Sequence, residues 1–287
     1  MTAVTLNDVG PRDGLQNQPR ILEPAARVRL VESLLHAGVS HVEAGAFVSP
    51  KAVPAMAGAE QVLSGLTGYS DAVLTVLIPN LKGYELATAA GARSVCMVLY
   101  GSDEMAQANV RMSREQAEDM TAEILQRARE DGVRVTATIA VSFECPYSGP
   151  VDPGLIERIA ARFLDLGADE LCLADTIGAA HPRQVHELVS RIANGRDASR
   201  LGCHFHDTRA MGLANVYAAL EAGVRKFDAA IAGLGGCPFA PGASGNVATE
   251  DVVMMLEQMG LDTGIDLGRL MKAAEMAYEL TGTAPGG

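Results

Sequence analysis

The sequence predicts a (β/α)8 barrel with an additional helix near its C-terminal end. Short apolar runs typical of buried strands recur eight times, and amphipathic stretches with helical spacing lie between them. The length of 287 residues also suits this fold, for which ~250 residues are typical. We therefore expect a single domain over residues 1–287, with residues 262–280 forming a helix that packs on the barrel.

The expected strands follow the chain from end to end. They cover residues 4–9, 42–47, 73–78, 94–100, 133–143, 170–174, 202–206 and 227–232. Apolar residues at helical spacing predict helices between them, over residues 25–36, 114–131, 154–166, 182–193 and 213–222. A doubly wound open sheet is the alternative. It would carry a glycine-rich phosphate turn after its first strand, whereas residues 10–14 (GPRDG) are charged and lack that fingerprint.

The composition is that of a soluble globular enzyme. Hydrophobic residues make up 48% of the chain, and no apolar run reaches the roughly 18 residues of a membrane span. The net charge of −12 and the absence of Trp disfavour nucleic-acid binding and binding to an anionic membrane. Five cysteines without regular spacing and an N-terminus unlike a signal peptide predict reduced thiols and a cytoplasmic location.

Unusual polar residues gather where the predicted strands end. Active sites of (β/α)8 barrels lie at this carboxyl-terminal rim. The candidates, in chain order, are Arg12, Asp13, Gln16, Glu43, Asp175, His204, His206, Cys237 and Asn246. Each could instead be a structural polar residue that satisfies the backbone, an alternative that applies most to Glu43 and Asp175. Their convergence on one rim favours a site, because buried charges need partners.

The pair His204 and His206 is the most specific of these signals. Residues i and i+2 of a strand face the same side, so two imidazoles leave one strand together. With Asp13 and Asn246, they would offer a carboxylate, two imidazoles and an amide oxygen. Such a set suits Mg²⁺ or Mn²⁺ better than structural zinc, although imidazole also suits zinc. Cys237 lies in a glycine-rich segment, residues 233–246, where a thiol is suited to proton transfer; the alternative is a buried apolar cysteine.

Several motifs resemble those of the 3-hydroxy-3-methylglutaryl-CoA lyases, within the wider group of metal-dependent lyase and Claisen-type synthase barrels. The resemblance spans nearly the whole chain. The most specific match is GLGGCPFAPGASGN at residues 233–246. The others are VGPRDGLQN (9–17), FVSPK (47–51), PNLKG (79–83), CPY (145–147), DTIG (175–178) and HFHDT (204–208).

The resemblance implies an acyl-CoA substrate, a role in leucine degradation and a homo-oligomer, dimeric or larger. Asp13, His204, His206 and Asn246 would hold the cation, which would chelate the C3 hydroxyl and a carboxylate oxygen of the substrate. A base, with His204 and Asp13 as candidates, would take the hydroxyl proton as the C2–C3 bond breaks. Arg12 would stabilise the enolate and, with Gln16, bind the substrate, while Cys237 would donate a proton. Glu43 would orient Arg12 or a metal ligand, and Asp175 would support the site.

The chain departs from the family pattern near the expected acyl pocket. Where relatives carry small polar residues or a tyrosine, this chain has Ala46, Thr138, Ala140 and Cys172. Losing hydrogen-bonding groups from a pocket changes which substrate it accepts. A differently substituted 3-hydroxy-3-alkylglutaryl-CoA is therefore an expected substrate as well.

Two other functions stay open at the level of the sequence. One is another reaction on the same barrel, a Claisen-type acyl-CoA synthase or a ketoacid aldolase. The other is a non-catalytic binding protein that retains the barrel. The intact set of ligands disfavours the latter, because buried charges without a metal are costly.

Overall fold

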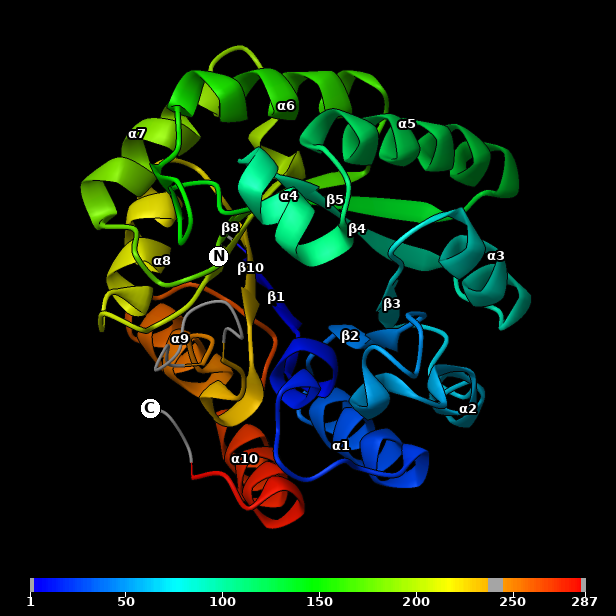
Figure 1. The fold of residues 1–287 in the computed structure, drawn as a ribbon. Helices are drawn as coiled ribbons and strands as arrows, with labels where there is room; N and C mark the ends of the chain where they lie inside the picture. Colours follow the sequence, from blue (N-terminus) through cyan, green and yellow to red (C-terminus); the bar gives the residue numbers. More distant parts are fainter. Residues whose placement is uncertain (1–2, 237–244, 285–287) are drawn as a thin grey trace.

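The computed structural model describes residues 3–236 and 245–284. Within these residues, eight parallel strands form a closed barrel in the order β1-β10-β9-β8-β5-β4-β3-β2, with helices around it (Figure 1). The predicted fold class is therefore confirmed. The barrel strands are β1 (Thr5–Asp8), β2 (His41–Ala46), β3 (Val73–Leu77), β4 (Ser94–Tyr100), β5 (Arg134–Ala140), β8 (Glu170–Asp175), β9 (Leu201–Phe205) and β10 (Lys226–Ala229).

The helices include four that the periodicity of the sequence did not reveal. These are α2 (Ala59–Gly65), α3 (Leu81–Ala89), α4 (Asp103–Val110) and α9 (Thr249–Gln258). The predicted helices appear within one residue of their expected bounds, as α1 (Pro24–His36), α5 (Arg114–Asp131), α6 (Pro153–Asp165), α7 (Pro182–Ala193) and α8 (Gly212–Glu221). No helix in the described part of the chain is both long and apolar enough to cross a bilayer.

The additional helix, α10 (Leu267–Thr281), lies beside α1 (Figure 1). It begins five residues later than the sequence predicted. Asp266 has extended backbone and its side chain accepts a hydrogen bond from the backbone N–H of Arg269 (2.9 Å), so it caps the first turn. The residues before Asp266 therefore form a connection to α9 rather than part of the helix.

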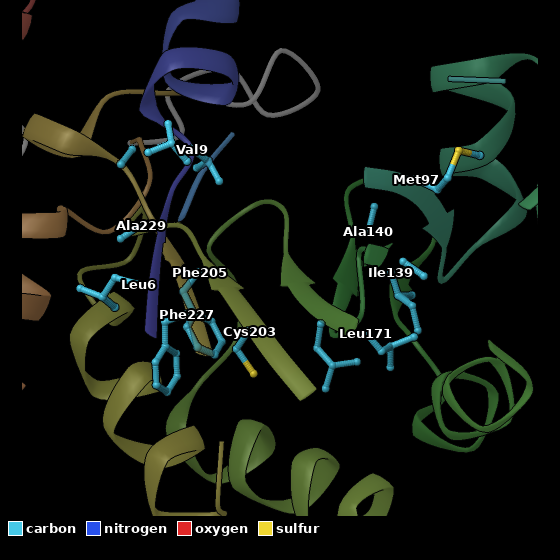
Figure 2. Packing of buried hydrophobic residues seen from close by; sticks show 14 of the residues in the cluster. Leu6, Val9, Met97, Ile139, Ala140, Leu171, Cys203, Phe205, Phe227 and Ala229 are labelled. Atoms are coloured by element: carbon cyan, nitrogen blue, oxygen red, sulfur yellow. The ribbon is translucent and has the colours of Figure 1, made fainter. Parts of the chain in front are cut away.

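Most strands alternate between an apolar outer face and an inner face that carries many polar side chains. Leu6, Ile139 and Leu171 belong to the buried apolar layer, part of which Figure 2 shows. Their neighbours Asn7, Thr138 and Glu170 line a cavity inside the barrel. Side chains on alternate positions of a strand face opposite ways, so this pattern separates the packed layer from the interior.

A two-stranded antiparallel ribbon, β6 (Glu144–Cys145) with β7 (Gly149–Pro150), follows β5. The predicted strand over residues 133–143 is therefore too long at its end. Val141, next after β5, has a φ of +50°. Its backbone N–H donates to the Thr176 hydroxyl (2.8 Å) instead of continuing the sheet. The chain turns there and leaves the barrel.

Candidate metal centre

Three of the predicted ligands, Asp13, His204 and His206, lie together at the carboxyl ends of the strands. Each offers one ligand atom, and these atoms lie within 4.8 Å of one another. The Nε2 atom of His206 is 4.0 Å from Oδ2 of Asp13, and the ring centroids of the two histidines are 5.2 Å apart. A carboxylate and two imidazoles at this spacing can bind one divalent cation.

The local backbone explains why these three side chains meet. Asp13 lies in a π-helical turn (Gly10–Gly14) directly after β1, and single π turns of this kind are frequent at functional sites. His204 belongs to β9, while His206 lies one residue beyond the end of that strand. A β-bridge from His206 to Asn246 keeps the chain extended there. Both imidazoles consequently line the barrel cavity.

Asn246, the fourth predicted ligand, lies against Asp13. Its Nδ2 donates to Oδ2 of Asp13 (2.8 Å) and to the carbonyl of Leu234 (3.0 Å). Its Oδ1 is buried and has no hydrogen-bond partner among residues 3–236 and 245–284. A Cβ on Gly235 would lie 2.5 Å from Nδ2 of Asn246, so only glycine permits this approach. A buried acceptor atom that makes no hydrogen bond and lies beside a carboxylate is suited to bind a cation.

Arg12 connects Asp13 to Glu43 through two short ion pairs. Its two terminal nitrogens lie 2.7 Å from Oδ1 of Asp13 and 2.7 Å from Oε2 of Glu43. Burial alone would raise the pKa of Asp13, but Arg12 and the two histidines hold that pKa at about 2. Burial raises the pKa of Glu43 despite the opposing charge of Arg12. Asp13 is thus a carboxylate over the whole physiological pH range.

Asp175 is hydrogen-bonded within its own loop, whereas Gln16 lines the same cavity as the cluster. The two oxygens of Asp175 accept hydrogen bonds from the backbone N–H groups of Ala179 (2.9 Å) and Ala180 (3.1 Å). These bonds stabilise the turn after β8, which is the structural role that the sequence left open. Burial raises the pKa of Asp175 to about 6. Gln16 lines the barrel cavity.

Cys237, the predicted proton donor, lies outside the described residues. The sequence-based role of this thiol therefore stays a prediction.

Asp228, which the sequence did not reveal as a candidate, contacts one of the predicted ligands. Its Oδ2 lies 3.1 Å from Nδ1 of His204, and its Oδ1 accepts a hydrogen bond from Nδ2 of Asn7 (2.8 Å). Lys226 and Asp228 alternate with Phe227 and Ala229 in β10. A charged residue at every second position of an otherwise apolar strand was the available signal, because such residues must face a polar interior.

The cavity around the cluster has a volume of about 490 Å³, within the range of small-molecule sites. Its polar part contains the three clustered ligands, Arg12 and Glu43. Its other wall carries half-buried apolar side chains from β3, β4, α5 and two adjoining loops, which are Val48, Leu77, Val98, Met112 and Met120. The site can therefore hold a molecule that is charged at one end and apolar along its length.

Two known proteins of similar sequence are named as lyases of acyl-CoA thioesters. Hydroxymethylglutaryl-CoA lyase of Pseudomonas mevalonii is 43% identical over 99% of this chain and 94% of its own length. (R)-citramalyl-CoA lyase of Chloroflexus aurantiacus is 44% identical over 96% of this chain and 90% of its own length.

A solved structure of an HMG-CoA lyase from A. baumannii, in complex with coenzyme A and 3-methylmalate, has the same fold. Its TM-score is 0.95 and its sequence identity is 40%, over 99% of this chain and 93% of the other. The family model described as HMGL-like matches residues 3–277. This match confirms the resemblance found in the sequence motifs, and the chain belongs to the HMGL-like family.

Proposed function

We propose that this protein is a divalent-metal-dependent carbon–carbon lyase. Its substrate would be 3-hydroxy-3-methylglutaryl-CoA, or a close 3-hydroxy-3-alkylglutaryl-CoA, cleaved to acetyl-CoA and acetoacetate or the corresponding keto acid. The observation that carries this proposal is the cluster of Asp13, His204 and His206 beside Arg12 in one cavity. The lyases among its relatives support it.

Asp13, His204, His206 and Asn246 would hold the cation, with Mg²⁺ or Mn²⁺ preferred by the oxygen and imidazole donors. The two features that fit a metal are the grouped donors and the open Oδ1 of Asn246. When bound, the cation supplies Lewis-acid chemistry that lowers the pKa of the substrate's C3 hydroxyl.

Arg12 would stabilise the oxygen of the thioester enolate that forms as the C2–C3 bond breaks. Its guanidinium is held from both sides by Asp13 and Glu43, so it needs no reorganisation during the reaction. Because these two carboxylates raise its pKa against the effect of burial, Arg12 stays protonated throughout. Gln16, which lines the same cavity, would contact the substrate as well.

Glu43 is the acidic group best suited to accept the proton of the C3 hydroxyl. Asp13, with a pKa of about 2, is a weak base, whereas burial raises the pKa of Glu43. The Oε1 atom of Glu43 is buried and has no hydrogen-bond partner among the described residues. The bonding electrons of C2–C3 pass to the enolate, and a proton donor, predicted from sequence as Cys237, would return a proton to C2.

A different acyl group is the second candidate within the same reaction. Of the four departures from the family pattern, Thr138 and Ala140 line the cavity, whereas Ala46 and Cys172 are not among its lining residues. Both lining side chains are small, and the Thr138 hydroxyl pairs with the Cys96 thiol (3.4 Å). The relative from C. aurantiacus is named for citramalyl-CoA, whose acyl group differs from hydroxymethylglutaryl. Both observations favour testing several 3-hydroxyacyl groups.

The cytoplasmic location and the homo-oligomer also stay proposals. Cys96, Cys145, Cys172 and Cys203 are buried free thiols, which suits a reducing compartment.

A panel of CoA thioesters tests the proposed function. The purified protein with Mg²⁺ or Mn²⁺ is incubated with several 3-hydroxyacyl-CoAs, and acetyl-CoA and keto acid are quantified. We expect equal amounts of the two products and loss of turnover with a chelator. A protein that binds the metal but releases acetyl-CoA from no substrate is not this lyase. Consumption of acetyl-CoA together with a keto acid would instead indicate a synthase.

A further inference from the structure

We propose that Asp228 is a positioning residue of the metal centre and that Asn7 holds it in place. In this role Asp228 keeps His204 in the tautomer whose Nε2 carries a free lone pair. The inference rests on the metal centre of the proposed function.

The arrangement spans three adjacent strands at one level of the barrel. Asn7 of β1 pairs in register with Asp228 of β10, and Asp228 pairs in register with His204 of β9. Residues in register on neighbouring strands face the same side, so the three side chains meet inside the barrel. The two distances, 2.8 Å from Asn7 Nδ2 to Asp228 Oδ1 and 3.1 Å from His204 Nδ1 to Asp228 Oδ2, are those of hydrogen bonds.

A carboxylate only accepts hydrogen bonds, so the Nδ1 atom of His204 must carry the proton in this contact. In neutral imidazole the Nε2 atom then holds the lone pair that can bind a cation. The thiol of Cys172 also donates to Oδ2 of Asp228 (3.6 Å). Together with Asn7, it fixes the direction of the carboxylate and hence the direction of the imidazole ring.

Carboxylates that hold a ligating histidine typically change metal affinity by 10–100-fold when they are replaced. Asp228→Asn is the sharpest change, because it keeps the shape of the side chain. If the new amide oxygen keeps the bond from Asn7, its NH2 group faces Nδ1 of His204. That donor selects the tautomer with a proton on Nε2, which is the atom needed for the metal. Asp228→Ala removes the acceptor without adding a donor, so its effect should be smaller.

The control variant is Glu170→Gln. Glu170 lies on β8, two residues before Cys172, and it also lines the barrel cavity. Its carboxylate forms an ion pair with Lys226 (2.7 Å). Its replacement removes a carboxylate from the interior of the barrel without touching His204. It should leave the metal affinity and the tautomer of His204 unchanged.

Two measurements on the full-length protein test the proposal. Calorimetric titration with Mn²⁺ gives the dissociation constant of each variant. ¹⁵N NMR of histidine-labelled, metal-free protein, recorded at a pH where the His204 imidazole is neutral, gives the tautomer of His204, whose signal is identified by its loss in His204→Ala. We expect an Nδ1–H tautomer in the wild type and a 10–100-fold weaker Mn²⁺ affinity in Asp228→Asn, with its tautomer reversed.

An Nε2–H tautomer of His204 in the wild type would overturn the proposal, and this measurement does not depend on whether any variant folds. The proposal is also overturned if a folded Asp228→Asn protein keeps wild-type Mn²⁺ affinity. Failure of the proposed function would look different. In that case His204→Ala itself would leave Mn²⁺ binding unchanged, or no CoA thioester would be cleaved, whereas the tautomer would still report on Asp228.

Discussion

At the scale of single residues, the candidate centre combines a permanent anion, Asp13, and a permanent cation, Arg12, with two imidazoles. Asp13 stays ionised because the charges of Arg12 and the histidines outweigh its burial. Arg12 stays protonated because Glu43 and Asp13 flank it. A divalent cation would therefore meet a carboxylate that needs no deprotonation before binding.

Removing either histidine should weaken metal binding without unfolding the protein. We expect His204→Ala and His206→Ala each to lower the affinity for Mg²⁺ or Mn²⁺ and to reduce kcat by orders of magnitude, because each removes one ligand atom. Calorimetry and turnover measure the two effects, and circular dichroism checks the fold. His186→Ala, at an exposed position of α7, is the matched control and should be unchanged. Wild-type metal affinity in both cluster variants would refute the site.

Arg12→Gln should lower kcat and kcat/KM by the same factor. The charge of Arg12 is needed where the enolate oxygen becomes negative, and one such stabiliser is typically worth ~10²–10³ in rate. Steady-state kinetics on the best substrate of the panel measures this factor, with the exposed Arg183→Gln on α7 as control. A raised KM with normal kcat would show that Arg12 only binds the substrate.

At the scale of elements, a buried junction of hydrogen bonds between β1 and α9 stabilises the end of the barrel that carries the cluster. Oδ2 of Asp8, the last residue of β1, accepts a hydrogen bond from the Thr249 hydroxyl at the start of α9 (2.7 Å). Its Oδ1 accepts one from the backbone N–H of Gly10, which opens the π-helical turn (2.8 Å). The Glu250 carboxylate accepts from the backbone N–H of Ala232 on the loop after β10 (3.1 Å). One buried junction therefore supports the turn that carries Asp13.

This junction predicts a pH dependence of stability. Burial raises the pKa of Asp8 from 3.8 to about 7, although hydrogen bonds from Thr249 and Gly10 oppose the rise. Between these two pKa values, Asp8 is protonated in the folded state but ionised in the unfolded state. The stability that Asp8 contributes is complete below the unfolded pKa and is lost as the pH rises through the folded pKa.

Asp8→Asn stays neutral at every pH and keeps the shape of the side chain. The free energy of unfolding of the metal-free variant should therefore fall less than that of the wild type as the pH rises from below 3.8 to above about 7, the two pKa values of Asp8. Urea denaturation at several pH values measures the difference. Identical pH profiles for the variant and the wild type would contradict a raised pKa of Asp8.

At the scale of the whole molecule, the interior of this barrel contains a cavity lined in part by polar side chains. Barrels of this fold are usually filled by Val, Ile and Leu. Here the polar residues Asn7, Thr75, Ser94, Thr136 and Thr138 share the lining with the apolar wall, and the cavity continues to Lys226 and Glu170. The interior thus supplies space below the metal centre, while the apolar packing lies between strands and helices (Figure 2).

Thr138→Tyr should fill part of this space and narrow the choice of acyl group. The measured quantity is kcat/KM for a substrate with a large C3 substituent, divided by kcat/KM for the methyl substrate. We expect this ratio to fall by about 10-fold or more. The panel of CoA thioesters measures this ratio, and Thr138→Ser, which keeps the hydroxyl near Cys96, is the control. An equal loss on all substrates would show that Thr138 does not contact the C3 substituent.

The barrel and the kinds of residue at its candidate centre can be predicted from local patterns in the sequence. Alternation of strand and helix is a local property, so the bounds of α5 and α7 could be read directly from their apolar spacing. The spacing of His204 and His206 likewise fixes that both face one side of a strand. Helices α2, α3 and α4 are at most nine residues long, too short to show a clear period, and the sequence did not reveal them.

The residues that touch the cluster depend instead on how the strands are arranged in the closed barrel. Asp228 meets His204, and Asn7 meets Asp228, because closure of the barrel places β10 between β9 and β1 in a particular register. Asn7 and Asp228 are 221 residues apart in the chain. Conversely, Asp175 at the end of β8 turns to its own loop rather than to the ligands. Such contacts depend on strand register and side-chain direction across the barrel, which local periodicity does not encode.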